Sequence, residues 1–168
     1  MNETLNVNLN NLTEEERNTL LALVEKSVKE PESKVWKPKE NETYYYVRTN
    51  GTVTTADWTN DRFDNVTYVL GNCYRTEKEA KFALEKQKVY AELKRFAQEH
   101  NETEIDWNND TQRKYYLYYN FDHDCLIMDF NYKVKYPNAI YFTSKEIAEQ
   151  AIKAIGEERI KRYYLEVE

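Results

Sequence analysis

The sequence contains one pattern twice, at a constant offset of 68 residues. In each copy an aromatic residue is followed by a hydroxyl residue suited to cap a helix, and then by a helical stretch that contains alanines. The equivalent pairs are Tyr68 and Tyr136, Tyr74 and Phe142, Thr76 and Ser144, Ala80 and Ala148, Ala83 and Ala151, and Leu84 and Ile152. Runs rich in tyrosine and other strand-forming residues precede both copies and favour β-strands. The repeat therefore predicts an α+β fold with two β-β-β-α units, in which antiparallel sheets pack against helices.

The first unit, expected over residues 41–101, begins with the clearest hairpin signal in the chain. Its first two strands flank an Asn-Gly dipeptide at residues 50–51, which is typical of tight turns. A third strand is expected over residues 65–75. A capping box formed by Thr76 and Glu79 then begins a long helix.

The second unit, expected over residues 102–168, repeats this order. A long hairpin is expected over residues 114–136 and a short strand over residues 139–142. A closing helix is expected over residues 143–164, where apolar residues recur with helical spacing.

The N-terminal arm, residues 1–40, is expected to contain one amphipathic helix and a linker. Thr13 and Glu16 form a second capping box, which predicts a helix that begins at this point. Pro31 and Pro38 interrupt the segment that follows. The narrow apolar stripe of this helix contains Leu20, Leu21, Val24 and Val28.

The long helix of the first unit has more apolar surface than one sheet can cover. One face contains Ala80, Ala83, Leu84, Gln87 and Ala91, and the neighbouring face contains Phe82, Val89, Leu93 and Phe96. A stripe of this width predicts a helix packed on two sides. The second partner is either the N-terminal helix or a second copy of the protein, so a homodimer is one of the two expectations.

A short motif, "DWTND" at residues 57–61, returns as "DWNND" at residues 106–110. A calcium loop of the EF-hand type needs oxygen ligands at alternate positions, a glycine and a distal glutamate, and neither motif has this spacing. Asp and Asn side chains favour turns because they bind backbone groups two residues further along, and Trp supplies an apolar anchor. Both motifs are therefore predicted to be structural corners rather than metal sites.

The overall charge argues against a nucleic-acid binder, and the motif content argues against an enzyme. The net charge of −6 argues against direct binding of nucleic acid, because contacts to phosphate supply most of that affinity. The cluster Asp122-His123-Asp124 has no second imidazole and no nucleophile with an orienting partner, so it is predicted to be a solvated turn. We expect no catalytic residue, no cofactor and no metal ion. No apolar run is long enough to cross a membrane, and a cytoplasmic location in a bacterial cell is expected.

The 15 tyrosines supply the candidate binding residues. Alternation along a strand places Tyr116 and Tyr118 on the face opposite Leu117, and Leu117 is the better core candidate. Tyr116 and Tyr118 are therefore predicted to lie on an open face, and Tyr44 and Tyr46 form the corresponding set in the first unit. Cross-strand aromatic pairing within the sheet is the alternative role for these rings. The acidic residues Asp61 and Asp64 are the candidates for contact with a basic surface.

Five stretches of the chain together resemble a broad family of small proteins from phages and prophages of low-GC bacteria. They are "NLTEEERNTLLALVEKS", "VWKPKENETYYYV", the segment from "WTNDRFDN" to "RFAQEHN", "IDWNNDTQRKYYLYY" and the segment from "IYFTSKEI" to "KRYY". The family has no assigned activity, so the resemblance supplies a genomic setting and no site residue. It implies an inhibitor that docks on a host defence protein with a basic surface, such as a CRISPR effector nuclease. The alternatives are a sponge that binds a nucleotide signal on the tyrosine-rich face, and a virion or replication accessory protein.

Overall fold

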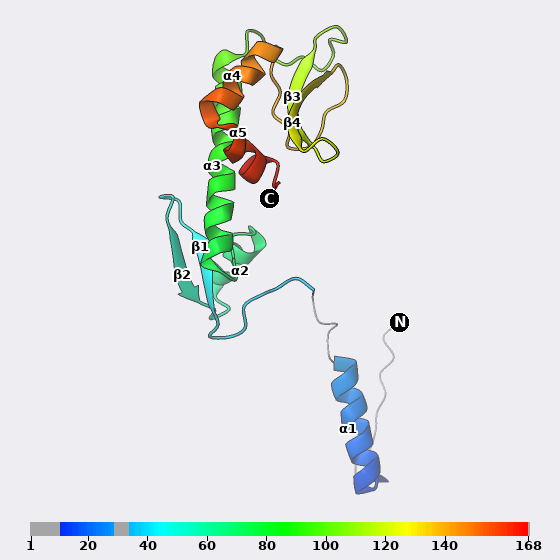
Figure 1. The fold of residues 1–168 in the computed structure, drawn as a ribbon. Coiled ribbons are helices and arrows are strands. Elements are labelled where there is room, and N and C mark those ends of the chain that lie inside the picture. Colours follow the sequence, from blue (N-terminus) through cyan, green and yellow to red (C-terminus); the bar gives the residue numbers. More distant parts are fainter. Residues whose placement is uncertain (1–10, 29–33, 168) are drawn as a thin grey trace. The chain divides into compact units, whose positions relative to one another are not determined.

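The computed structural model describes residues 11–28 and 34–167 (Figure 1). The chain divides into two compact units, residues 1–37 and residues 38–168. Helices and two small antiparallel sheets make up the described part, so the predicted α+β class is confirmed. None of the helices in the described ranges has the length and hydropathy that a membrane span requires.

The N-terminal unit contains helix α1, Glu14–Val28. Its capping box is present as predicted: the Thr13 backbone N–H donates to the Glu16 carboxylate at 2.8 Å, and the Glu16 N–H donates to Thr13 Oγ1 at 3.3 Å. Leu21 of the expected apolar stripe is exposed. Pro31 of the linker and the side chain of Val28 lie outside the described residues.

The first hairpin pairs β1, Thr43–Val47, with β2, Val53–Asp57, as the Asn-Gly signal predicts. The Arg48 N–H donates to the Thr52 carbonyl at 2.8 Å, and the Gly51 N–H donates to the Arg48 carbonyl at 2.9 Å. Gly51 has φ +77°, a left-handed conformation that glycine adopts without a steric penalty. The connection is therefore a three-residue hairpin loop rather than a two-residue one.

The third strand predicted over residues 65–75 is wrong, because residues 65–69 belong to helix α2, Arg62–Val69. Asp61 caps the helix by accepting the Asp64 N–H at 2.9 Å. At the other end Gly71 has φ +69°, its N–H donates to the Tyr68 carbonyl, and the Asn72 N–H donates to the Thr67 carbonyl. These two bonds form a Schellman motif, which ends the helix. Of the predicted strand, Tyr74 forms a backbone bridge to Tyr45 of the hairpin. The Asn72 side chain also bonds to the hairpin, since it accepts the Val47 N–H at 2.9 Å and donates to the Val47 carbonyl at 2.8 Å.

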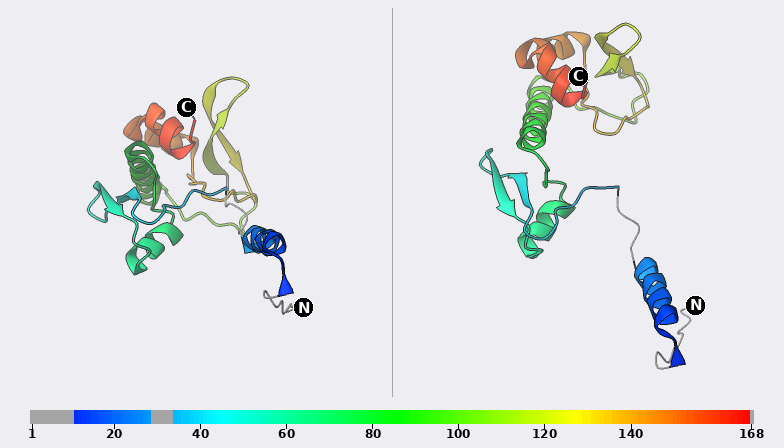
Figure 2. Two further views of the ribbon diagram at one scale, coloured as in Figure 1. Left: turned by 90° about the horizontal axis from the view of Figure 1, so that it is seen from below. Right: turned by 60° about the horizontal axis from the view of Figure 1, so that its bottom comes forward.

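Helix α3, Glu77–His100, is the longest element and begins at the predicted capping box of Thr76 and Glu79. It contacts β1 and β2, and also the helices α4 and η2, whose bounds are given below. Figure 1 shows the first hairpin near one end of α3 and α4 beside the other, and the two views of Figure 2 agree.

The second hairpin is confirmed, with β3, Lys114–Asn120, paired with β4, Cys125–Asn131. The short strand expected over residues 139–142 is reduced to one bridge, between Phe142 and Tyr115. This bridge corresponds to the one between Tyr74 and Tyr45 in the first half of the chain.

The closing helix is not continuous, which corrects the prediction for residues 143–164. Helix α4 spans Lys145–Ile155, the three-residue turn α5 spans Glu157–Arg159, and the π-helix η2 spans Ile160–Tyr164. Gly156 separates the first two, with φ +99° and ψ 125°. Because this backbone conformation is incompatible with a helix, the chain changes direction here.

The wide apolar face of α3 is covered from within residues 38–168. Val89 and Leu93 are fully buried, and they belong to one core together with Ile147, Ala151 and Ile160. The remaining buried members of this core are Ala97, Leu117, Ile140, Phe142, Ala148 and Ile155. Packing on two sides is confirmed, but C-terminal elements supply the second partner. Two residues of the face that motivated the expectation of a homodimer, Val89 and Leu93, are therefore buried within one chain.

Candidate functional site

Helix α2 has an inverted distribution of polar and apolar side chains. The two residues that it buries are polar: Asp64 is 2 % exposed and Thr67 is 6 % exposed. Apart from Arg62, the exposed residues of the helix and its C-cap are apolar, with exposed fractions of 48 % for Phe63, 48 % for Val66, 82 % for Val69 and 75 % for the C-cap Leu70. These four side chains, which we call the α2 face, follow the spacing of one side of a helix. Solvent-exposed apolar clusters of this kind commonly mark interaction sites.

Hydrogen bonds to Asp64 hold α2 on the first hairpin and so fix the direction of the α2 face. The Tyr44 hydroxyl donates to Asp64 Oδ1 at 2.8 Å. The Thr59 N–H and the Thr59 hydroxyl donate to Asp64 Oδ2 at 2.7 and 3.1 Å. Because both carboxylate oxygens are bound, this buried charge is satisfied without an ion pair.

Aromatic packing adds to this attachment. The Trp58 ring lies edge-on to Tyr44 at 5.9 Å, and Phe63 lies edge-on to Tyr46 at 5.2 Å. Trp58 is 3 % exposed, so the "DWTND" corner is an apolar anchor followed by a helix cap.

We predict that this buried carboxylate makes stability depend on pH. Burial alone would raise the pKa of Asp64, but the hydrogen bonds from Tyr44 and Thr59 outweigh it and hold the pKa below its ordinary value. A group whose pKa is lowered by folding contributes stability above its unfolded pKa of about 3.9, and this contribution is lost as the pH falls through the folded value. In urea titrations at several pH values, Asp64→Asn should be less stable than the wild type at neutral pH, and the difference should shrink as the solution is acidified.

The matched control is Asp61→Asn, which replaces an exposed aspartate by another good helix cap. The stability of this variant should change with pH as that of the wild type does. A difference between Asp64→Asn and the wild type that does not change with pH would contradict the proposed role of the Asp64 charge.

Three of the predicted contact residues have other roles. Tyr44 is fully buried and Asp64 nearly so, and both predictions of surface contact are wrong. The reason is that α2 covers the face of the hairpin that a third strand would have left open. Asp61 is exposed, and its side chain caps α2. Tyr46 is half-buried against Phe63 and is the one residue of this set that lies beside the α2 face.

Tyr116 does not lie on an open sheet face, which corrects the prediction for this residue. Leu117 is buried as predicted, which places Tyr116 and Tyr118 on the opposite side of β3. On that side the Tyr116 ring lies 5.0 Å from Tyr136 and 6.0 Å from Tyr141. Tyr116 is half-buried because the segment that follows β4 covers it with these two rings, and Tyr118, which is also half-buried, lies 5.9 Å from the Tyr116 ring.

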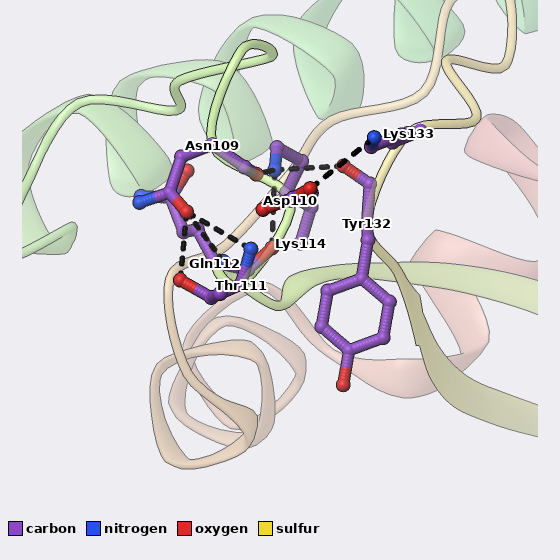
Figure 3. Close-up of polar contacts among 7 residues, drawn as sticks. All are labelled: Asn109, Asp110, Thr111, Gln112, Lys114, Tyr132 and Lys133. Carbon is purple, nitrogen blue, oxygen red and sulfur yellow. Dashed lines mark hydrogen bonds and ion pairs between the residues drawn. The ribbon is translucent and has the colours of Figure 1, made fainter.

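The second corner, "DWNND", is held by a buried lysine rather than by a helix. The Lys114 ammonium group is fully buried and donates to the carbonyl oxygens of Asn109, Gln112 and Tyr132 at 2.9, 3.0 and 2.9 Å (Figure 3). Asn109 Oδ1 accepts the Thr111 N–H at 2.9 Å, as expected for an Asn in a turn. Through these hydrogen bonds, Lys114 joins this corner to the segment that follows β4.

The acidic loop at residues 122–124 forms the tip of the second hairpin, as predicted. Asn120 Oδ1 accepts the N–H groups of Asp122 and His123, and the Tyr119 hydroxyl donates to Asp124. Within residues 11–28 and 34–167, no group of three or more His, Cys, Asp or Glu side chains is placed to hold a metal ion.

The α2 face was missed because residues 65–70 were interpreted as a strand. Two local signals could have revealed it: an aspartate placed to cap a helix at Asp61, and a Gly-Asn pair at residues 71–72 suited to end one. Once these two signals are taken as the ends of a helix, Phe63, Val66 and Leu70 are seen to follow helical spacing in the sequence.

Comparison with protein-family models, with curated proteins and with solved structures finds no match to this chain.

Proposed function

We propose that the protein is a non-enzymatic binding protein that docks on a partner protein through the α2 face. The observation that carries the proposal is the inverted helix: α2 buries Asp64 and Thr67 and presents Phe63, Val66 and Val69 to solvent. Burying an exposed apolar side chain at an interface is worth roughly 1.5–3 kcal/mol, so a few such residues can supply most of the affinity of a docking site.

The charge of this region indicates the chemistry of the partner. Residues 57–72 contain three aspartates and one arginine, in a chain of net charge −6. A complementary partner has an apolar groove with basic residues at its rim, and it accepts α2 as a helix in a groove. The resemblance to phage accessory proteins supports a partner in the bacterial host, and we propose a defence protein that handles nucleic acid, such as a CRISPR effector nuclease.

The test is capture of the partner from infected host cells by the full-length protein, followed by affinity measurement with the purified partner. The double substitution Val69→Ser/Leu70→Ser should weaken the complex about a hundredfold, because two exposed apolar contacts are lost. The melting temperature should remain within a few degrees of the wild type, since both side chains are largely exposed. Capture of a host defence protein supports the proposed inhibitor, whereas capture of a virion or replication protein supports the alternative role as an accessory protein.

The matched control is Phe121→Ser at the tip of the second hairpin, where the side chain is 80 % exposed. This variant should bind the partner as the wild type does. If the α2 double variant is folded and retains full affinity, or if Phe121→Ser weakens binding equally, docking through the α2 face is refuted.

A further inference from the structure

A pocket of about 610 Å³ lies in the unit formed by residues 38–168, away from α2. Its walls are the C-terminal half of α3, the segment 101–107 and the segment 135–141. The volume falls in the range of roughly 300–1,000 Å³ that is typical of sites for small molecules.

The walls of the pocket are held in place by side-chain hydrogen bonds. The Asn101 side chain donates to the Tyr141 carbonyl at 3.0 Å and accepts the Thr143 N–H at 3.0 Å, which joins the end of α3 to the segment after β4. The Lys114 ammonium group joins the "DWNND" corner to the same segment, because it donates to the carbonyl groups of both Asn109 and Tyr132 (Figure 3). The pocket is therefore formed before any ligand arrives, which lowers the entropic cost of binding.

Three of the residues that line the pocket are aromatic. Trp107 lies edge-on to Tyr141, with ring centroids 4.9 Å apart and an interplanar angle of 83°. Tyr90 is 37 % exposed on α3, and the buried Ile140 contributes an aliphatic surface. Rings of this kind offer stacking surfaces to a flat ligand, and stacking on aromatic side chains is worth about 1–3 kcal/mol for a nucleobase.

Two lysines of the pocket are available to an anionic ligand. Lys94 and Lys135 line it, and neither has a carboxylate within 4.0 Å in the part of the chain that the structure describes. Glu102 and Glu104 also line the pocket and offset these two charges. A third lysine lies next to the pocket: the Lys114 ammonium group is 5.3 Å from the centroid of the Trp107 ring and is hydrogen-bonded to three carbonyl oxygens. The Lys135 ammonium group lies 5.7 Å from the same ring centroid.

We propose that this pocket binds a small planar anion of the class of nucleoside monophosphates. The base stacks among Trp107, Tyr141 and Tyr90, and the phosphate is bound by Lys94 and Lys135. This proposal does not depend on docking through the α2 face, because the two sites share no residue.

The test is calorimetric titration of the full-length protein with adenosine 5′-monophosphate and guanosine 5′-monophosphate. Adenosine and ribose 5-phosphate are the matched ligands that lack the phosphate and the base, and each should bind at least about tenfold more weakly. Lys94→Gln and Lys135→Gln should each weaken nucleotide binding about tenfold without a change in melting temperature, because each removes one charged hydrogen bond.

Lys78→Gln is the matched control, since Lys78 is an exposed lysine near the opposite end of α3. It should leave nucleotide binding unchanged, and so should Val69→Ser/Leu70→Ser on α2. The proposal is overturned if the wild type binds neither nucleotide at millimolar concentration. It is also overturned if adenosine binds as tightly as its monophosphate, or if all three lysine variants bind like the wild type.

Discussion

Replacing Trp58 by alanine should lower the free energy of unfolding by about 3–5 kcal/mol, the range for truncating a buried large aromatic residue. The Trp58 ring is 3 % exposed and lies between Tyr44 and Tyr68, at centroid distances of 5.9 and 6.2 Å. Its removal leaves a cavity between the hairpin and α2 that the surrounding backbone cannot fill, because Asp64 and Tyr44 hold the two elements together. Denaturation with urea, monitored by circular dichroism, measures this change.

Trp107→Ala is the matched comparison, since Trp107 is half-exposed in the corner that repeats the motif. Its loss of stability should be smaller, about 1–3 kcal/mol. If Trp58→Ala lowers the free energy of unfolding by no more than Trp107→Ala does, the buried Trp58 ring does not stabilise the first corner as its burial indicates.

Replacing Lys114 by methionine should lower the free energy of unfolding by about 2–4 kcal/mol. Methionine has a similar length and no donor, so the carbonyl groups of Asn109, Gln112 and Tyr132 lose their shared partner. Each buried carbonyl group left without a hydrogen bond destabilises the fold by about 1–3 kcal/mol. Part of this loss is offset, because the variant no longer has to bury the charge of the lysine. The same urea titration measures the effect.

Lys133→Met is the control for the loss of a lysine from this region. Its side chain is 67 % exposed and pairs with Asp110 at 3.4 Å, so the change should stay within about 0.5 kcal/mol. If both variants lower the free energy of unfolding by the same amount, the prediction is wrong, because the three carbonyl groups then find other partners when Lys114 is replaced.

The parts of the fold that were predicted correctly depend on local signals. The capping boxes at Thr13 and Thr76 mark where α1 and α3 begin, because each satisfies backbone groups within one turn of the chain. Both hairpins were recognised from strand-forming runs that flank a turn. Such signals act over a few residues and are visible without the rest of the protein.

The segment at residues 65–70 shows why local preference fails elsewhere. Val66, Thr67, Tyr68 and Val69 all favour strands, yet they are helical because Asp61 and Gly71 supply the two ends and Asp64 finds partners on the hairpin. The partners of Asp64 are brought together by tertiary structure, so no window along the chain contains the whole arrangement.

The candidate contact residues were misplaced for a related reason. Strand alternation correctly separates Leu117 from Tyr116 and Tyr118, but it cannot say what covers the second face. In both halves of the chain that cover comes from the segment that follows the hairpin. In the first half this segment is α2, and in the second it carries Tyr136 and Tyr141.

The position of α3 in the core has a consequence for synthesis on the ribosome. Its buried residues Val89 and Leu93 are covered by Ile147, Ala151 and Ile160. The last of these is translated about 70 residues after Leu93, which takes roughly 3–14 seconds at elongation speeds of about 5–20 residues per second. During this interval the nascent chain presents the apolar side of a long helix without its cover, and chaperones that bind such surfaces have time to engage it.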